Sequence, residues 1–355
     1  MRNWLAAFAP LDPCPIIVAP MAGAGGVELA AAAMRGGAIG SLPCALIDAG
    51  QVVAQAKALR DQADGPINLN FFAHTMPLPP DETAWRERLR PYYAEYGVSP
   101  AMTPATLRRP FDDAAAAAVE QVRPELVSFH FGLPKATVLD RVRGTGARVI
   151  ATATSLAEAR LLERAGVDAI IAQGWEAGGH RGDFLDAPEG SEMGLFALLP
   201  QMADAVDVPV IAAGGIADER GIAAALMLGA SAVQIGSAYL HCPESLISTA
   251  HRAKLAGEAA ETTRFTNVMS GRRARGLGNR VIEELGPMSD VAPPFPHASP
   301  ALAPLKAAAE AVGRDDFSAH WSGQAARLGR SISATELTRT LAHDARTILQ
   351  ETYHG

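Results

Sequence analysis

Eight short apolar runs alternate with segments of helical character along the first 235 residues of this 355-residue chain. Each run is short enough for a buried strand and is followed by a turn or loop, most of which contain glycine or proline. Strands that alternate with helices pair in parallel through right-handed crossovers, and eight of them close a sheet into a barrel. The pattern therefore predicts an α/β fold, the (β/α)8 TIM barrel, with strands at residues 16–19, 38–42, 67–71, 126–129, 148–151, 169–172, 208–212 and 232–235.

An open, doubly wound sheet is the alternative for a chain of alternating strands and helices. Its dinucleotide fingerprint, Gly-x-Gly-x-x-Gly, would follow the first strand. The first loop instead reads Pro20-Met21-Ala22-Gly23-Ala24-Gly25-Gly26, in which the glycine spacing differs. The barrel is therefore the favoured architecture.

Two stretches depart from the repeat. Residues 74–110 form a proline-rich, aromatic insertion after the third strand, with a short helix expected at about 84–96. Because it follows the carboxyl end of a strand, the insertion is expected near the mouth of the barrel. The barrel is assigned to residues 1–240 and is followed by a smaller, mostly helical, lid-like region at 241–306. Residues 307–355 are predicted to return to the barrel through a closing helix at about 334–350.

Charge and composition exclude several classes of function. The formal net charge is −7, from 31 basic and 38 acidic residues, and no basic run is long enough to follow a nucleic-acid backbone. No segment offers about 18 uninterrupted apolar residues, so a membrane span is not expected. The cysteines Cys14, Cys44 and Cys242 have no paired spacing and are interpreted as reduced thiols of a cytoplasmic protein. The histidines and carboxylates show no recognisable metal-ligand spacing, so no metal site is predicted.

Two glycine loops lie where a barrel commonly holds a phosphate group, after the seventh and eighth strands. They read Ala213-Gly214-Gly215-Ile216 and Gln234-Ile235-Gly236-Ser237. Glycine amides and a serine hydroxyl can bind an anion without lysine or arginine. One glycine pair alone is equally well explained as a tight turn, but two such loops at both expected positions favour a phosphate site.

A phosphate site fits a sugar phosphate, pyridoxal phosphate or flavin mononucleotide (FMN). A Schiff-base enzyme needs a suitably placed lysine, and none of the four lysines ends a predicted strand. FMN is favoured by Met21, Ala22 and Gly23 after the first strand. It is also favoured by the amides Asn70 and Gln173, because an amide both donates and accepts hydrogen bonds, as the edge of a flavin ring requires. Each such amide is also a common structural cap.

The loop at 173–182, after the sixth strand, combines four glycines with one carboxylate and one imidazole. Gly178 and Gly179 let the backbone approach a ligand closely. His180 titrates near neutrality, so it can take a proton from an acidic carbon or bind an anionic substrate. Glu176 either orients His180 or only fixes the loop. His180 is therefore the predicted catalytic residue.

Three further side chains are candidates for contact with substrate. His130 ends the fourth strand and faces the same mouth, either as a substrate-binding residue or as a hydrogen-bonded wall histidine. A substrate that carries a carboxylate would need a cation near the mouth. Arg181 and Lys306 are the candidates for that cation.

The chain resembles the class I nitronate monooxygenases, formerly called 2-nitropropane dioxygenases. The resemblance covers most of the chain, with its motifs in the right order. It is carried by Ala19-Pro20-Met21-Ala22-Gly23, Asn70, Ser128-Phe129-His130-Phe131-Gly132-Leu133-Pro134, Ala172-Gln173-Gly174 through Gly182, Ala213-Gly214-Gly215-Ile216, Gln234-Ile235-Gly236-Ser237 and Thr266-Asn267-Val268-Met269-Ser270-Gly271-Arg272.

This resemblance implies an FMN-containing barrel that oxidises alkyl nitronates with O2 to a carbonyl compound and nitrite, by one-electron flavin chemistry. It implies that His180 is the active-site base or substrate partner. The expected partners are a nitronate and O2, while the physiological nitronate and a homodimer stay open. Together with the loop residues above, the predicted FMN contacts are Met21, Ala22, Gly23, Asn70, Gln173, Gly178, Gly179, Gly214, Gly215, Gln234, Gly236 and Ser237.

Flavin-dependent enoyl reductases share the barrel and a Glu-x-Gly-Gly-His loop like that at residues 176–180. An NAD(P)H-dependent enoyl-ACP reductase is therefore the alternative function. Gln173, the Gly179-His180-Arg181-Gly182 ending and the long region after the eighth strand favour the monooxygenase.

Overall fold

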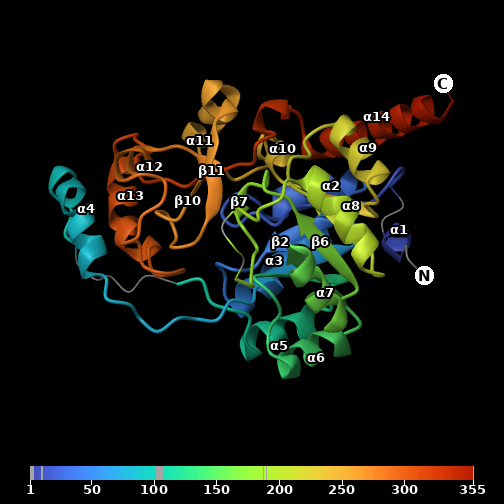
Figure 1. Cartoon of the computed structure of the whole chain (residues 1–355), viewed down its shortest axis with the longest axis horizontal. Coiled ribbons are helices and arrows are strands. Elements are labelled where there is room, and N and C mark those ends of the chain that lie inside the picture. The colour runs from blue at the N-terminus through green and yellow to red at the C-terminus, as the bar shows by residue number, and fades with distance from the viewer. Residues whose placement is uncertain (1–3, 9–10, 101–106, 187, 189, 355) are drawn as a thin grey trace.

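The computed structural model describes residues 4–354 apart from 9–10, 101–106, 187 and 189. Its larger part is a barrel of parallel strands surrounded by helices (Figure 1). A parallel bridge between Ile17 and Ile39 brings the two end strands together, so the prediction of a (β/α)8 barrel is confirmed. In their spatial order the eight strands are β1 (Ile16–Val18), β9 (Ala232–Ile235), β8 (Val210–Ala213), β6 (Ala169–Gln173), β5 (Arg148–Ala153), β4 (Leu126–His130), β3 (Ile67–Phe72) and β2 (Gly40–Pro43).

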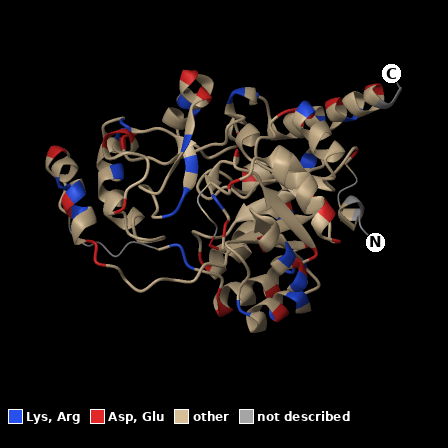
Figure 2. Cartoon of the chain, viewed as in Figure 1, with Lys and Arg blue, Asp and Glu red and all other residues tan. Residues whose placement is uncertain are grey.

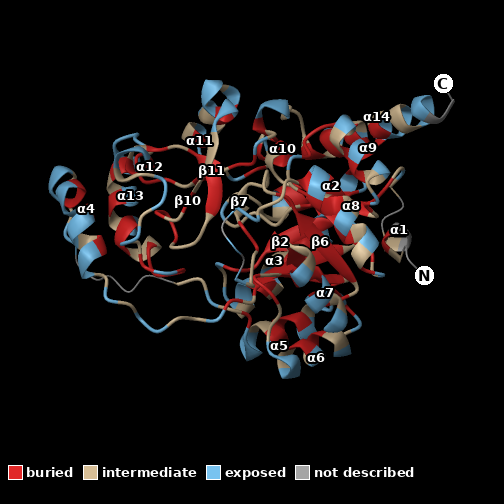
Figure 3. Cartoon of the chain, in the orientation of Figure 1, coloured by how far each residue is buried: buried red, intermediate tan, exposed pale blue. Residues whose placement is uncertain are grey.

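Alternate residues of each strand contribute to two separate cores. In β1, Ile16 and Val18 pack in the layer between strands and helices, whereas Ile17 belongs to the core inside the barrel. In β6, Ile171 points inward in the same way. Both faces of the sheet are buried, as Figure 3 shows in red, which explains why the strands are almost continuously apolar in sequence.

Several barrel helices are preceded by a residue whose side chain accepts a hydrogen bond from the helix backbone. Asp48, Asp112, Ser155 and Asp218 each accept from an amide in the first turn of the following helix, and Asp48 forms a full capping box with Gln51. The helices around the barrel are α2 (Val27–Arg35), α3 (Ala49–Gln62), α5 (Asp113–Val122), α6 (Ala136–Gly144), α7 (Leu156–Arg164), α8 (Leu195–Ala205) and α9 (Glu219–Met227).

Two helices near the chain ends complete the barrel. The short α1 (Trp4–Phe8) contributes Leu5 to the inner core, and the Trp4 indole donates to the Asp168 carbonyl. After the four-residue α10 (Ser237–Leu240) the chain leaves the barrel, and α14 (Ala334–His354) returns to pack against α2 and α9. The Thr335 hydroxyl donates to the Ala32 carbonyl over 2.6 Å, which anchors α14 to α2.

The second region lies beside the carboxyl ends of the barrel strands and contains a small antiparallel sheet that was not predicted. Strand β11 (Ala274–Leu277) pairs with β10 (Thr263–Thr266), with β12 (His320–Trp321) and with β7 (Gly179–His180) from the loop after β6. This pairing ties the loop of His180 to the second region. The remaining elements here are α11 (Thr249–Ala256), η1 (Glu258–Glu261), α12 (Arg280–Leu285), α13 (Ser299–Ala311) and η2 (Ala326–Leu328).

The insertion after β3 reaches away from the barrel and packs on the second region (Figure 1). Its helix, α4 (Thr83–Glu95), places Trp85 and Tyr93 against α13, where they donate to the carbonyls of Ala298 and Ala301. Both ring systems are buried. Residues 101–106 of the predicted insertion lie outside the described residues.

Charged side chains gather on the outer helices and on β10 and β11 rather than on the barrel strands (Figure 2). In the described part of the chain, no helix combines the length and the apolar character needed to cross a membrane. All three cysteines are buried free thiols, and burial raises the pKa of each to about 12.

Candidate active site

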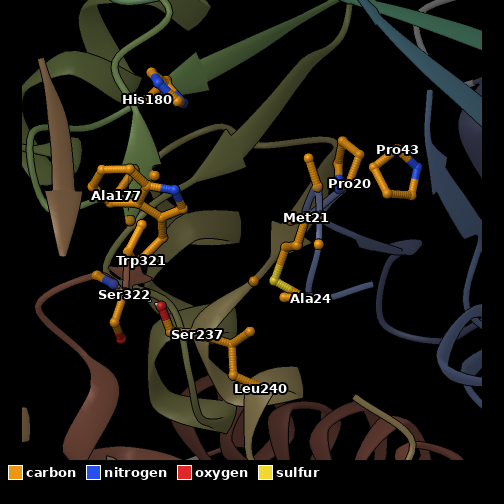
Figure 4. A pocket seen from close by; sticks show the side chains of 18 of the residues that line it. Pro20, Met21, Ala24, Pro43, Ala177, His180, Ser237, Leu240, Trp321 and Ser322 are labelled. Carbon is orange, nitrogen blue, oxygen red and sulfur yellow. Dashed lines mark hydrogen bonds between the residues drawn. The ribbon is translucent and has the colours of Figure 1, made fainter. Parts of the chain in front are cut away.

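A cavity of about 450 Å³ lies at the carboxyl ends of the barrel strands, between the barrel and the second region. Figure 4 shows Pro20 and Met21 on one side of it and Ala177 and Trp321 on the other. The structure brings the predicted catalytic residue, the predicted cofactor contacts and His130 to this one cavity, while their individual binding roles stay predictions. They are Met21, Ala22, Gly23, Asn70, His130, Gln173, Gly178, Gly179, His180, Gly214, Gly215, Gln234, Gly236 and Ser237.

The glycine loop after β8 and the loop of Gly178 form one wall of this cavity. Gly214 and Gly215 have φ angles of 103° and 70°, in the left-handed region that favours glycine. A Cβ atom on Gly178 would collide with the backbone of Ser322 and Gly323. The sequence therefore leaves bare backbone beside the cavity, as a phosphate site requires.

Polar atoms without hydrogen-bond partners belong to residues that line the same cavity. Ser322 Oγ and Gln234 Oε1 are buried and have no hydrogen-bond partner among the described residues. The Ser237 hydroxyl accepts from the Gly323 amide over 2.8 Å, so its own hydrogen remains available to a ligand. Buried polar atoms are normally paired, and these unpaired atoms fit a polar, phosphate-bearing ligand.

The two predicted amides also have structural roles. Gln173 Nε2 donates to the His180 carbonyl over 3.0 Å, and Gln173 Oε1 accepts from the Gly182 amide over 2.7 Å. Asn70 Nδ2 donates to the carbonyl and the hydroxyl of Ser128. Gln173 therefore holds the loop that carries His180 closed on itself.

Glu176 fixes the loop and does not orient His180. Both of its carboxylate oxygens accept from the Leu195 amide, at 2.9 and 2.8 Å, where α8 begins. A carboxylate is favourable at this position because the first amides of a helix lack partners and carry partial positive charge. Of the two interpretations from sequence, the structural one is therefore favoured.

His180 lies on β7, held by pairing with Ala274 of β11. Its imidazole is surrounded by aromatic rings: the centroids of Phe295 and Trp321 lie 5.3 and 5.5 Å away, and that of Phe131 lies 6.1 Å away. This apolar surrounding lowers the pKa of His180 well below its ordinary value of 6.5, and the positive charge of Arg108 lowers it further. The imidazole is therefore neutral at pH 7.

The hydrogen bonds of Ser270 define which nitrogen of His180 is basic. Ser270 Oγ lies 2.8 Å from His180 Nε2 and 3.3 Å from the carbonyl oxygen of Arg272. A hydroxyl has one hydrogen and a carbonyl can only accept, so we assign the Ser270 hydrogen to the Arg272 carbonyl and the hydrogen of the shorter contact to His180 Nε2. Nε2 therefore carries the hydrogen, and Nδ1, which makes no hydrogen bond within the described residues, keeps its lone pair.

His130 supports the backbone of His180. Its Nε2 donates to the His180 carbonyl over 3.1 Å, so its Nδ1 accepts from the Thr152 hydroxyl, also over 3.1 Å. Burial lowers the pKa of His130 to about 4, which keeps the ring neutral. Because both ring nitrogens are already bonded, the geometry favours the wall-histidine interpretation over the predicted substrate contact.

Of the two candidate cations for a substrate carboxylate, only Lys306 lines the cavity. Arg181 does not line the cavity: its guanidinium lies 4.9 Å from the Trp175 ring and donates to the Thr154 carbonyl. Lys306 does line it, 3.7 Å from Glu310. The described residues hold no group of three histidine, cysteine or acidic side chains placed to bind a metal ion.

Sequence reasoning missed four residues of this site. Ser270 lies in a stretch noted for its resemblance to the family, but nothing in its spacing indicated contact with His180. Trp321 and Ser322 reach the cavity because of the small sheet. Arg108 reaches it because the insertion returns to the barrel. These contacts join segments far apart in the chain and have no local sequence signal.

Comparison with known proteins identifies the family of the chain. A family model described as "Nitronate monooxygenase" matches residues 5–344. The chain is 43% identical to the nitronate monooxygenase of Paraburkholderia phytofirmans, over 95% of this chain and 93% of that protein. It is 42% identical to the nitronate monooxygenase of Pseudomonas aeruginosa, over 94% of this chain and 96% of that protein.

Two solved structures resemble the chain over nearly its whole length. The nitroalkane oxidase of Streptomyces ansochromogenes has a TM-score of 0.90 at 36% identity, covering 98% of this chain and 99% of that one. FabK from Thermotoga maritima has a TM-score of 0.72 at 25% identity, covering 99% of both chains. The family match extends over nearly the whole chain and includes the strand ends that form the cavity. The chain therefore belongs to the nitronate monooxygenase family, a family of flavin-dependent oxidoreductases.

Proposed function

We propose that the protein oxidises alkyl nitronates with O2, giving a carbonyl compound and nitrite, with FMN as its cofactor. The observation that carries the proposal is one shared cavity, which the two glycine loops and the neutral imidazole of His180 line together. The relatives named nitronate monooxygenase support the substrate class.

The cavity offers groups that suit both ends of FMN. The backbone at Gly214 and Gly215 and the hydroxyls of Ser237 and Ser322 would hold the phosphate. The loop at 21–23, together with Asn70 and Gly178, would lie along the flavin ring. When bound, the flavin supplies electron transfer between substrate and O2, which no side chain here can provide.

The protein's own part is to position the substrate, exclude water and move one proton. His180 Nδ1 accepts the proton from the carbon beside the nitro group when the substrate arrives as a neutral nitroalkane. A substrate that is already a nitronate needs no such transfer. The rings of Phe131, Phe295 and Trp321 around His180 keep water away from the reacting carbon.

The cofactor and the electron donor can be tested together. The purified protein is expected to be yellow and to release FMN, identified by chromatography, when denatured. Under anaerobic conditions a nitronate is expected to change the flavin spectrum rapidly, and NADH is not. Admission of air should then yield nitrite. A colourless protein that cannot be reconstituted with FMN contradicts the proposal.

The same anaerobic mixing experiment tests the alternative function, an enoyl reductase. An NAD(P)H-dependent enoyl-ACP reductase predicts rapid change of the flavin spectrum on anaerobic mixing with NADH or NADPH. If neither nucleotide changes the flavin spectrum, the reductase function is excluded. If a nucleotide changes the spectrum rapidly and a nitronate does not, the monooxygenase function is excluded.

Ser270→Ala tests the assignment of the basic nitrogen. Without the Ser270 hydroxyl, the hydrogen of His180 is no longer fixed at Nε2, so turnover of a neutral nitroalkane is expected to fall about 10-fold, the equivalent of one hydrogen bond. Turnover of a pre-formed nitronate should change little. Imidazole ¹⁵N chemical shifts report the tautomer directly, and Ser270→Thr, which keeps a hydroxyl, is the control. An unchanged tautomer in Ser270→Ala would contradict the assignment.

A further inference from the structure

Arg108 is the cation at this cavity for which the described residues provide no carboxylate partner within 4 Å. Lys306, which also lines the cavity, has Glu310 beside it at 3.7 Å. Arg272 already contacts the Asp183 carboxylate. An arginine without a counter-ion at the wall of a cavity indicates that a ligand supplies the negative charge.

The chain around Arg108 places this side chain at the cavity by identifiable contacts. Three residues further on, the Phe111 amide donates to the Phe72 carbonyl over 2.7 Å, which fixes the returning insertion to the end of β3. Arg108 Nη1 lies 3.4 Å from the Ser299 hydroxyl at the start of α13. This long hydrogen bond leaves most of the guanidinium donors free.

Arg108 lies close to the group that meets the substrate. Its guanidinium carbon is 5.9 Å from the centre of the Phe295 ring, which in turn lies 5.3 Å from the His180 ring. Among the charges that act on His180, Arg108 has the largest effect on its pKa. Both residues line the cavity, so a negative group bound there lies in the field of Arg108 and in the same cavity as His180.

We propose that Arg108 binds the two oxygens of the substrate's nitronate group and so selects the anionic nitronate over the neutral nitroalkane. This inference rests on the proposed function, because it takes a nitronate as the substrate. A guanidinium presents paired N–H donors in one plane, and a nitronate presents two oxygens in one plane. The Phe295 ring lies near the guanidinium and packs against Phe72, and these rings strengthen the interaction because they exclude water.

Arg108→Met is the variant that tests this role, with Arg109→Met as its matched control. Arg109 is the adjacent residue, is exposed and does not line the cavity. In the flavin-loaded full-length protein, Arg108→Met is expected to raise KM for a pre-formed nitronate about 30-fold or more, with a smaller change in kcat. Arg108→Lys keeps the charge but not the paired donors, so its KM should be intermediate. Arg109→Met should match the parent.

Nitrate binding tests the same residue without turnover. Nitrate is a planar anion with no carbon to oxidise, and its binding can be followed by tryptophan fluorescence because Trp321 lines the cavity. The parent and Arg109→Met are expected to bind nitrate at least about 10-fold more tightly than Arg108→Met. Nitrate binding can be measured even if the protein does not oxidise nitronates. The role of Arg108 in anion binding and the proposed oxidation are therefore tested independently.

The outcomes that overturn the inference are specific. They are an unchanged KM in Arg108→Met, equal nitrate affinity in Arg108→Met and the parent, or no nitrate binding by the parent. If Arg108→Met does not fold, Arg108→Gln, which is polar but uncharged, replaces it with the same expectations.

Discussion

Replacement of His180 by Asn is expected to lower turnover of a neutral nitroalkane by about 100-fold or more, since it removes a positioned general base. His180 lines the cavity, and its Nε2 is bonded to Ser270, which leaves Nδ1 as the basic nitrogen. Asparagine is of similar size and can still donate to Ser270, so the loop should keep its geometry. Initial rates with freshly dissolved nitroethane, at matched FMN content, measure the effect.

A pre-formed nitronate is the internal control for this variant. It needs no deprotonation, so its turnover in His180→Asn should fall much less than that of the nitroalkane. FMN content should equal that of the parent, because no predicted phosphate contact is altered. Equal activity of variant and parent on both substrate forms would remove His180 from the mechanism.

The pH profile of the parent gives a second measurement of the same group. Only the neutral imidazole accepts a proton, and the pKa of His180 is lowered well below 6.5 in the folded protein. Turnover of the nitroalkane should therefore stay constant from about pH 7.5 down to about pH 6.5, and fall only below that. An imidazole of ordinary pKa would already be half protonated at pH 6.5, and half of the rate would be lost.

The barrel could be predicted from the sequence because its determinants are local. Each strand is a short apolar run, and helices start at side chains such as Asp48, Ser155 and Asp218 that cap their own first turn. Parallel strands place their carboxyl ends at one edge, so residues as far apart as Met21 and Ser237 were expected at one mouth. The resemblance to the family then supplied the chemistry.

The environment of His180 could not be predicted, because it depends on contacts between distant segments. The partner of Nε2 is 90 residues away, and the strand that pairs with β7 belongs to a sheet whose strands are only two to four residues long. Strands that short give no recognisable alternation. The same holds for Arg108, whose place depends on how the insertion packs on the second region.

Trp85→Ala is expected to release the insertion helix α4 from the second region, because Trp85 is fully buried in the cluster that joins them. Truncation of a buried tryptophan costs about 3–5 kcal/mol, and here it also leaves the Ala298 carbonyl without its donor. The barrel has its own, larger core, so the loss should be local. Hydrogen exchange should therefore rise in α4 and α13 while exchange in the barrel strands stays slow.

Leu78→Ala is the matched control, since Leu78 lies in the same insertion and is 89% exposed. It should leave hydrogen exchange unchanged. Release of α4 also loosens the segment that carries Arg108, so Trp85→Ala should raise KM for a nitronate, whereas Leu78→Ala should not. Unchanged protection of α4 in Trp85→Ala would show that the tyrosine hydrogen bonds, such as that of Tyr93 to Ala301, hold the insertion without the tryptophan. If hydrogen exchange rises in Trp85→Ala but KM for the nitronate does not change, the position of Arg108 does not depend on the packing of α4.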